Sequence, residues 1–271
     1  IIYSALIVLI SKYILVTTLR KLAESLKLKP KTVGNIAGYA TSIPELLTIT
    51  TSSLRGLSGA SVYNIISSNV INFIQYIGAI LLNKNVDKIK NRAIITDIIL
   101  VIFTILIPIV LLKMNIELNI MIVPIFVILY ILFRVINDNV HKMYLKNEDE
   151  KIEHEIEVEE EKESKNRFQT IKYIIYLVIT GFLLYFVGDK LGNTLETLCK
   201  LFNISEAIIG ILLGFITSIP ELMTFFESQK YYKNEDDDML GVVEATNNLL
   251  TSNILNLFAI QTIGILITSI L

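Results

Sequence analysis

The chain has 271 residues and a formal net charge of −2, with 53% hydrophobic residues, 18% charged residues and a mean hydropathy of +0.60. This composition is too apolar for a water-soluble domain, and the apolar residues come in runs of about twenty, long enough to cross a bilayer as helices. The small negative charge and the lack of a basic stripe outside the short loops argue against nucleic acid as a partner. The sequence predicts an all-α, polytopic protein of the lipid bilayer.

Eight segments are predicted to cross the membrane, because each is apolar over about the length that a helix needs to span it. In chain order they are residues 1–19, 32–54, 60–82, 93–112, 118–137, 171–188, 205–228 and 241–270. The first segment has neither an initiator methionine nor a basic stretch before it, so we expect a trimmed helix and not a signal peptide. We therefore expect a short segment to precede Ile1 in the complete protein.

The region between the fifth and sixth spans is predicted to be a solvated linker. Residues 148–163 hold ten acidic residues and two lysines, a composition that cannot bury a core. The alternation in "IEHEIEVE" leaves a weak strand as the alternative. Lysines and arginines fall mainly in alternate loops, this linker included, which predicts that these loops are cytoplasmic and that the N-terminus lies outside.

Two phrases recur in the apolar spans. "GYATSIPELLT" at 38–48 returns as "GFITSIPELMT" at 214–224, and "NIISSNVIN" at 64–72 returns as "NLLTSNILN" at 248–256. An odd number of spans separates the two copies, so they have opposite orientations in the membrane. An inverted-topology repeat is typical of secondary transporters, whose binding site lies near the midplane. We predict a first repeat of five spans over 1–137, a charged cytoplasmic linker over 138–170, and an inverted second repeat over 171–271.

The repeated phrase places a proline and a glutamate inside each membrane span. Pro44 and Pro220 have no backbone N–H, so each helix is predicted to break just before Glu45 or Glu221. A carboxylate in mid-membrane costs about 2.5–3.5 kcal/mol, which indicates a function. Hydroxyl side chains share one helix face with the carboxylate, and the amide and hydroxyl side chains of the second phrase form a second stripe. Hard cations such as Ca²⁺ and Na⁺ prefer such oxygen ligands.

Other chemistry is predicted to be absent. The chain has one cysteine, Cys199, and its two histidines, His141 and His154, lie in or beside the charged linker, so no thiol, zinc, haem or other cofactor site is expected. The spans carry no residue set that intramembrane hydrolysis would use, so the chain is not expected to be an enzyme. The remaining acids near span ends are expected to be solvated or interfacial: Asp97, Glu117, Asp189, Glu196, Glu206 and Glu244.

With these residues, the pattern resembles the two alpha repeats of the calcium:cation antiporter superfamily, the sodium/calcium exchangers. The resemblance implies that Glu45 and Glu221 bind Ca²⁺ with the main-chain oxygens of Thr41 and Thr217. It further implies that Gly38 and Gly214 contribute carbonyl oxygens and that Asn72 and Asn256 complete the centre with their amides. The hydroxyls that it implies for the sodium sites are those of Ser42, Ser68, Ser218 and Ser252. The chain departs from the family where Ala40 and Ile216 replace a glycine, and where bulkier residues replace the glycines of the second phrase, namely Tyr63, Ser67, Asn247 and Thr251.

The resemblance also implies a function and a span count. The leading hypothesis is an antiporter that exchanges Ca²⁺ for Na⁺ by alternating access. The alternatives are exchange of Ca²⁺ for H⁺, transport of another divalent cation such as Mg²⁺ or Mn²⁺, and a transport-inactive membrane scaffold or sensor. The family is expected to have ten spans, so we expect two further spans after Leu271. The oligomeric state stays open.

Overall fold

A computed structural model of the chain describes residues 2–26, 28–116, 118–144, 167–233 and 237–270. Within these ranges the secondary structure is helical, with no β-strand, which confirms the all-α prediction. The α-helices are α1 (Ile2–Ile10), α2 (Val16–Leu26), α3 (Pro30–Thr41), α4 (Ile43–Leu54), α5 (Ser58–Leu82), α6 (Arg92–Lys113), α7 (Val123–Tyr144), α9 (Arg167–Phe202), α10 (Glu206–Thr217), α11 (Ile219–Lys233), α12 (Asp238–Ile254) and α13 (Gln261–Ile270). The π-helical segments Ser11–Leu15 and Leu255–Ile260 join α1 to α2 and α12 to α13.

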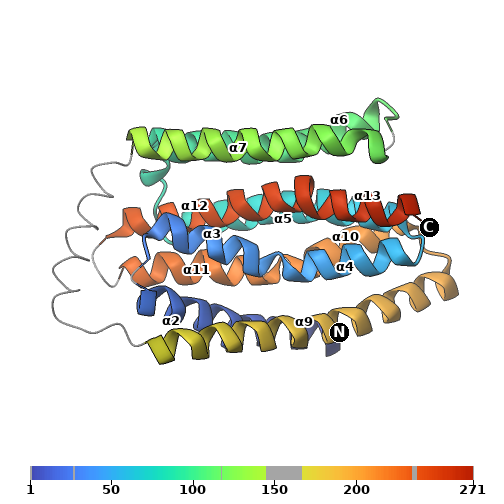
Figure 1. Cartoon of the computed structure of the whole chain (residues 1–271), viewed down its shortest axis with the longest axis horizontal. Helices are drawn as coiled ribbons and strands as arrows, with labels where there is room; N and C mark the ends of the chain where they lie inside the picture. The colour runs from blue at the N-terminus through green and yellow to red at the C-terminus, as the bar shows by residue number, and fades with distance from the viewer. Residues whose placement is uncertain (1, 27, 117, 145–166, 234–236, 271) are drawn as a thin grey trace.

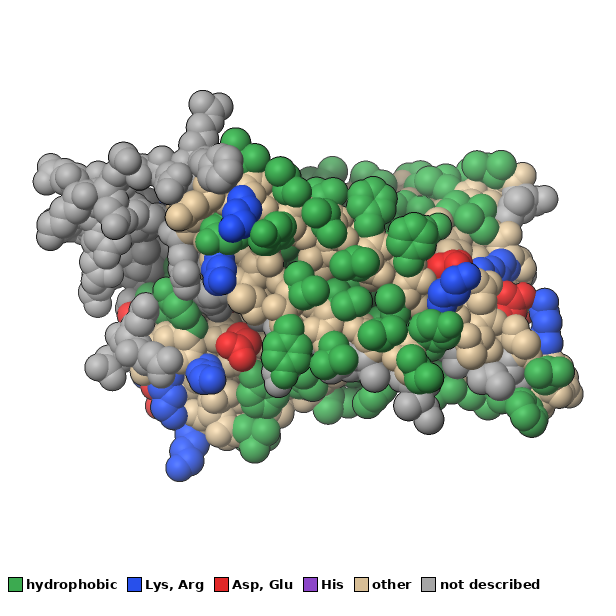
Figure 2. Space-filling model, turned by 90° about the horizontal axis from the view of Figure 1, so that it is seen from below, with side chains coloured by type: hydrophobic (Ala, Val, Ile, Leu, Met, Phe, Trp, Pro, Cys, Tyr) green, Lys and Arg blue, Asp and Glu red, His purple; other side chains and the backbone are tan. Residues whose placement is uncertain are grey.

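The helices lie roughly parallel to one long axis, as expected of a membrane bundle (Figure 1). Among the residues that the structure describes, six stretches are long and apolar enough to cross a membrane: Ser58–Leu82, Arg92–Lys113, Ile120–Tyr144, Gln169–Thr194, Glu206–Lys233 and Asp238–Ile270. The predicted spans at 1–19 and 32–54 are helical but are not among these six, so the count of eight is not confirmed. On the face drawn in Figure 2, hydrophobic side chains cover the middle, and the charged side chains lie toward the two ends.

Two of the predicted spans are broken helices, as the prolines predict. Helix α3 ends at Thr41 and α4 begins at Ile43, and α10 ends at Thr217 and α11 begins at Ile219. The residues at the breaks, Ser42 and Ser218, each donate a backbone N–H to the carbonyl of a glycine four residues earlier, at 3.2 and 3.1 Å. The pairs α3–α4 and α10–α11 run in opposite directions, which confirms the inverted topology (Figure 1).

Glycines let the broken helices of one repeat touch the backbone of the other. Helix α10 packs on α5, and a Cβ added to Gly210 would stand 2.5 Å from the Ala60 carbonyl oxygen. Helix α3 packs on α12, where a Cβ on Gly38 would stand 2.7 Å from the Cβ of Thr251 and 2.9 Å from the Asn248 carbonyl oxygen. Only glycine permits this approach. The half-helices are thereby held directly against the helices that carry the second phrase.

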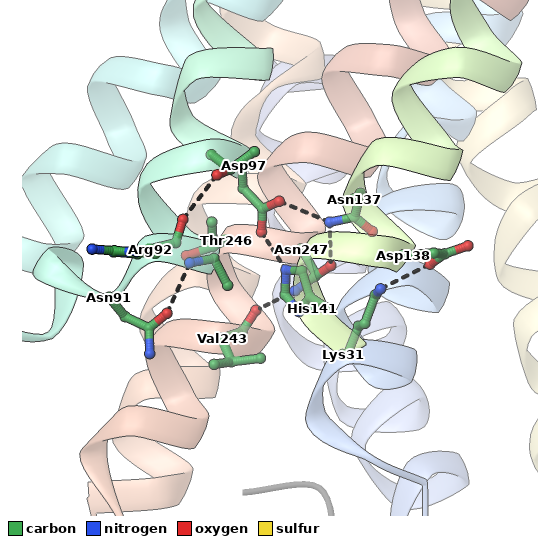
Figure 3. A network of polar contacts seen from close by, with 12 residues as sticks. Lys31, Asn91, Arg92, Asp97, Asn137, Asp138, His141, Val243, Thr246 and Asn247 are labelled. Carbon is green, nitrogen blue, oxygen red and sulfur yellow. Dashed lines mark hydrogen bonds and ion pairs between the residues drawn. The ribbon is translucent and has the colours of Figure 1, made fainter. Parts of the chain in front are cut away.

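A buried polar network joins α6, α7 and α12, and it corrects one prediction (Figure 3). Asp97 is fully buried, and its carboxylate contacts His141 Nε2 at 2.6 Å and accepts a hydrogen bond from Asn137 Nδ2 at 2.8 Å. Asn137 also donates to Asn247 Oδ1 at 3.5 Å. The expectation that Asp97 is solvated was wrong, because α7 and α12 cover it. His141, expected in or beside the linker, lies in α7 and is only 2% exposed.

The other acidic residues near the span ends differ in their contacts and in how deeply they are buried. Asp189 and Glu196 on α9 both accept hydrogen bonds from Arg55, at 3.1 Å each, so they join α9 to the end of α4. The Lys200 ammonium, with Arg55 contributing less, holds the pKa of Glu196 below its ordinary value. Glu206 Oε2 accepts the backbone N–H of Ala60. Glu244 is 4% exposed, so its expected interfacial position was wrong, because α3 packs over it; Glu117 lies outside the described residues.

Candidate cation-binding site

The two glutamates of the repeated phrase lie in the interior of the bundle, where no solvent reaches them. Glu45 and Glu221 are both 0% exposed, and each is in the first turn of its half-helix, α4 or α11. The positive end of a helix dipole stabilises a carboxylate at this position. Because both breaks place an acid at the start of a half-helix, the same local geometry occurs twice around one centre.

Hydroxyl side chains of both repeats connect to this centre. Ser252 donates a hydrogen bond to Glu221 Oε1 at 2.9 Å, and its hydroxyl is also 2.9 Å from that of Ser42. Ser68 lies 3.4 Å from the hydroxyl of Thr217 and donates to the Gly214 carbonyl at 3.4 Å. Hydrogen bonds therefore connect the first phrase of each repeat with the second phrase of the other. The break between α3 and α4 contacts α12, and the break between α10 and α11 contacts α5.

Amide side chains on α5 and on α12 with its π-helical continuation complete the centre. Asn72 donates from Nδ2 to Ser252 Oγ at 3.4 Å and to Asn253 Oδ1 at 3.2 Å. Asn256 donates from Nδ2 to Asn69 Oδ1 at 3.2 Å. All four asparagines are 0% exposed. Asn72 and Asn256 thus donate their N–H groups to residues of the other repeat, and their Oδ1 atoms are left without a partner among the described residues.

Several buried oxygens of this centre have no hydrogen-bond partner. They are both carboxylate oxygens of Glu45, Oε2 of Glu221, Oδ1 of Asn72, Oδ1 of Asn256 and Oγ of Ser218. A buried polar atom without a partner costs free energy, and buried carboxylates cost more than neutral groups. Five of these six atoms can only accept hydrogen bonds or bind a cation. Two carboxylates and neutral oxygens are the ligand types that Ca²⁺ and Na⁺ use.

The positions predicted from the sequence are therefore largely brought together. Direct hydrogen bonds connect Ser42, Ser252, Asn72 and Glu221 in one group, and Ser68, Thr217 and Gly214 in a second. The described residues contain no group of three or more His, Cys, Asp or Glu side chains that could hold a metal ion, so any cation would rely on the two glutamates and neutral oxygens. The carbonyl oxygen of Gly38 accepts a hydrogen bond from the Ser42 hydroxyl at 2.8 Å.

The sequence interpretation left out three asparagines that border the centre. Asn69 and Asn253 bond to the central amides, and Asn248 accepts from the Thr41 hydroxyl at 3.5 Å and donates to Thr224. Their signal was visible, since all three lie in the second phrase and recur in both repeats. The two halves are not identical in detail: Nδ2 of Asn64, which corresponds to Asn248, has no partner.

Comparisons with known proteins agree with this architecture. The chain is similar in structure to the sodium-calcium exchanger NCX_Mj soaked with 100 mM Na⁺ and 10 mM Sr²⁺, with 19% identity, 98% of this chain and 80% of that chain covered, and a TM-score of 0.59. It is also similar in structure to NCX_Mj soaked with 10 mM Na⁺ and zero Ca²⁺. In that comparison the identity is 21%, 98% of this chain and 81% of that chain are covered, and the TM-score is 0.57. A search of curated proteins finds no match.

Likeness at this level of identity concerns the fold alone. The family is identified by a separate comparison of the sequence with models of protein families. The family model described as sodium/calcium exchanger protein matches residues 1–137 and 172–271. The match contains both copies of both phrases and omits the whole of the charged linker. Because it covers most of the chain, this membrane transporter belongs to the sodium/calcium exchanger protein family.

Proposed function

We propose that the chain is a secondary-active antiporter that exchanges Ca²⁺ for Na⁺ at one central site. The observation that carries the proposal is the set of buried, unpartnered oxygens between the two half-helices, which includes three of the four carboxylate oxygens of Glu45 and Glu221. Buried polar atoms without a partner in the protein occur where a bound ligand supplies the missing partner. A bound cation would satisfy these acceptors and also balance the charge of the two carboxylates.

Charge balance favours a divalent cation together with sodium. Glu45 and Glu221 supply two negative charges, which neutralise one Ca²⁺, and the other central corners are the neutral amides of Asn72 and Asn256. With no third carboxylate at the centre, Na⁺ can replace Ca²⁺ while both glutamates stay ionised. We assign the flanking sodium sites to Ser42, Ser68, Ser218 and Ser252, and further ligand oxygens to Thr41, Thr217, Gly38 and Gly214.

Alternating access follows from the inverted repeats. The half-helices α3–α4 and α10–α11 approach the centre from opposite directions, so a small movement of the bundle exchanges the roles of the two halves. The unequal contacts of Asn248 and Asn64 support this view: Asn248 bonds to Thr224, whereas the matching Nδ2 of Asn64 has no partner. In the opposite state we expect Asn64 to bond to Thr48, the counterpart of Thr224.

Flux measurements in proteoliposomes test the function. We expect Ca²⁺ uptake that is driven by an outward sodium gradient at fixed pH and is unaffected by a proton gradient alone. Uptake driven only by protons would replace sodium with H⁺ as the coupling ion. Uptake of Mg²⁺ or Mn²⁺ in preference to Ca²⁺ would change the transported ion. Absence of flux and of cation binding would favour a scaffold or sensor.

A further inference from the structure

The asparagines one turn away from the central amides form a reciprocal contact between the repeats. Asn69 donates from Nδ2 to the backbone carbonyl of Asn253 at 3.2 Å, and Asn253 donates from Nδ2 to the backbone carbonyl of Asn69 at 3.1 Å. We name this pair of hydrogen bonds the asparagine clasp. Both residues are fully buried, on α5 and α12. The clasp therefore lies where the two second phrases cross.

The clasp has a fixed direction because its acceptors are backbone carbonyls. An asparagine amide has nearly the same shape in its two orientations, so its hydrogen-bond partners decide which end faces which way. A backbone carbonyl can only accept, so Nδ2 of Asn253 must face Asn69, and Oδ1 of Asn253 must face away. By the same reasoning, Oδ1 of Asn69 is presented to the opposite side.

The fixed orientation of Asn69 and Asn253 in turn fixes the orientation of the central amides. Oδ1 of Asn253 accepts from Nδ2 of Asn72, and Oδ1 of Asn69 accepts from Nδ2 of Asn256, each at 3.2 Å. The N–H groups of Asn72 and Asn256 are therefore held by the clasp, and their Oδ1 atoms are the ones left buried and without a partner. If either amide turned round, it would present an N–H₂ group where the proposed site needs an oxygen.

We propose that Asn69 and Asn253 are positioning residues that set the orientation of Asn256 and Asn72, and so determine that carbonyl oxygens face the cation. The inference rests on the proposed function. Without the clasp, Nδ2 of Asn72 loses its acceptor on Asn253 and keeps only the 3.4 Å bond to Ser252 Oγ, so the amide can turn and bring its N–H₂ group to the place of Oδ1. The fraction of chains with the oxygen facing the site then falls, and apparent cation affinity falls with it.

Equilibrium binding of Ca²⁺ and Na⁺ to the detergent-solubilised chain tests the inference, with thermal stability measured on the same samples. We expect Asn253→Ala and Asn69→Ala each to weaken binding about tenfold, as when only a tenth of the amides keep the oxygen inward. Asn253→Asp should retain more affinity than the alanine variant, because a protonated carboxyl can both accept from Asn72 and donate to the Asn69 carbonyl. If an alanine variant cannot be purified, Asn253→Ser replaces it, since a serine cannot reproduce both hydrogen bonds.

The matched control is Tyr76→Phe. It removes the buried hydrogen bond between Tyr76 and Thr246, at 2.7 Å, which also joins α5 to α12 but does not touch the central amides. We expect it to lower stability and change cation affinity less than twofold. Equal losses of affinity in Tyr76→Phe and the alanine variants, or no loss in the latter, would overturn the clasp alone. An unchanged chain that binds neither cation would instead overturn the proposed function and, with it, this inference.

Discussion

At the scale of single residues, the main feature is charge placed where no solvent reaches it. Glu45 and Glu221 are fully buried, and only one of their four carboxylate oxygens has a hydrogen-bond partner. Helix N-termini offset part of the cost, at roughly 0.3–2 kcal/mol each. That is less than the several kcal/mol by which an unpaired buried ion is penalised. These residues therefore lower stability in the absence of a cation, which is how binding sites differ from structural cores.

Neutralising either glutamate is expected to lower cation transport without lowering the stability of the fold. We expect Glu45→Gln and Glu221→Gln each to reduce divalent-cation flux on the order of a hundredfold or more, because one charge at about 4 Å contributes roughly 4 kcal/mol at an effective dielectric constant of 20. The cation-free proteins should melt at the same or a higher temperature, since an unpaired charge is removed. Proteoliposome flux and thermal melting measure the two effects.

The matched control for this pair is Glu227→Gln on the same half-helix as Glu221. Glu227 is exposed, so its substitution should leave both flux and melting temperature close to those of the unchanged chain. Retained flux in Glu45→Gln or Glu221→Gln would remove that residue from the site.

At the scale of helices, the site depends on how closely broken and unbroken helices approach. The breaks at Ser42 and Ser218 were predictable, because Pro44 and Pro220 remove a helical donor whatever the surroundings. The burial of Asp97 was not predictable, because His141 and Asn137 reach it from another helix across 40 or more residues. Hydropathy reports how apolar a segment is, and it does not identify which neighbouring helix covers a polar residue.

The close approach of α10 to α5 gives a prediction with an internal control. Gly210→Ala would place a Cβ 2.5 Å from the Ala60 carbonyl oxygen and 2.9 Å from the Asn64 backbone nitrogen, so the helices must separate. We expect a loss of about 1–3 kcal/mol in the free energy of unfolding, together with weaker cation binding. Gly78→Ala on α5 meets no atom within 4 Å and should be neutral or stabilising by about 0.5–1 kcal/mol. Equal melting temperatures of the two variants would contradict the packing argument.

The buried network between α6, α7 and α12 is expected to contribute to stability. Asp97→Ala removes the acceptor of Asn137 and the partner of His141, and each unsatisfied buried group costs roughly 1–3 kcal/mol. We expect a clearly lower melting temperature. Thr96→Ala on the same helix should change it little, because Thr96 is only half-buried and its hydroxyl bonds to the Arg92 carbonyl of its own helix. A similar melting temperature for both variants would mean that water replaces the network.

At the scale of the whole molecule, two repeats of opposite direction surround one centre. The doubled phrases predicted this relation, and the opposed half-helices confirm it. The number of spans could not be derived in the same way, since α3 and α4 carry hydroxyl, glycine and proline residues that lower their hydropathy while they still pack inside the bundle. The ligand assignments of the candidate site and the division into 1–137, 138–170 and 171–271 stay predictions.

The orientation of the bundle in the membrane is the remaining prediction at this scale. Lysines and arginines gather in the loops at the end of the bundle where α7 ends and α9 begins, so this end should face the cytoplasm. Ser164 lies outside the described residues and precedes α9 in the sequence, whereas Ser205 is exposed and follows α9, just before α10. The two serines should therefore lie on opposite sides of the bilayer.

Cysteine labelling in intact cells tests this orientation. Because Cys199 is the only cysteine, Cys199→Ser provides a background without thiols, into which Ser164→Cys or Ser205→Cys is introduced. We expect an impermeant thiol reagent to label Ser205→Cys in intact cells and Ser164→Cys only after the membrane is opened, because α9 crosses the bilayer between the two positions. The reverse pattern would invert the bundle and place the N-terminus inside. Labelling of both positions from the same side would contradict the crossing of α9 itself.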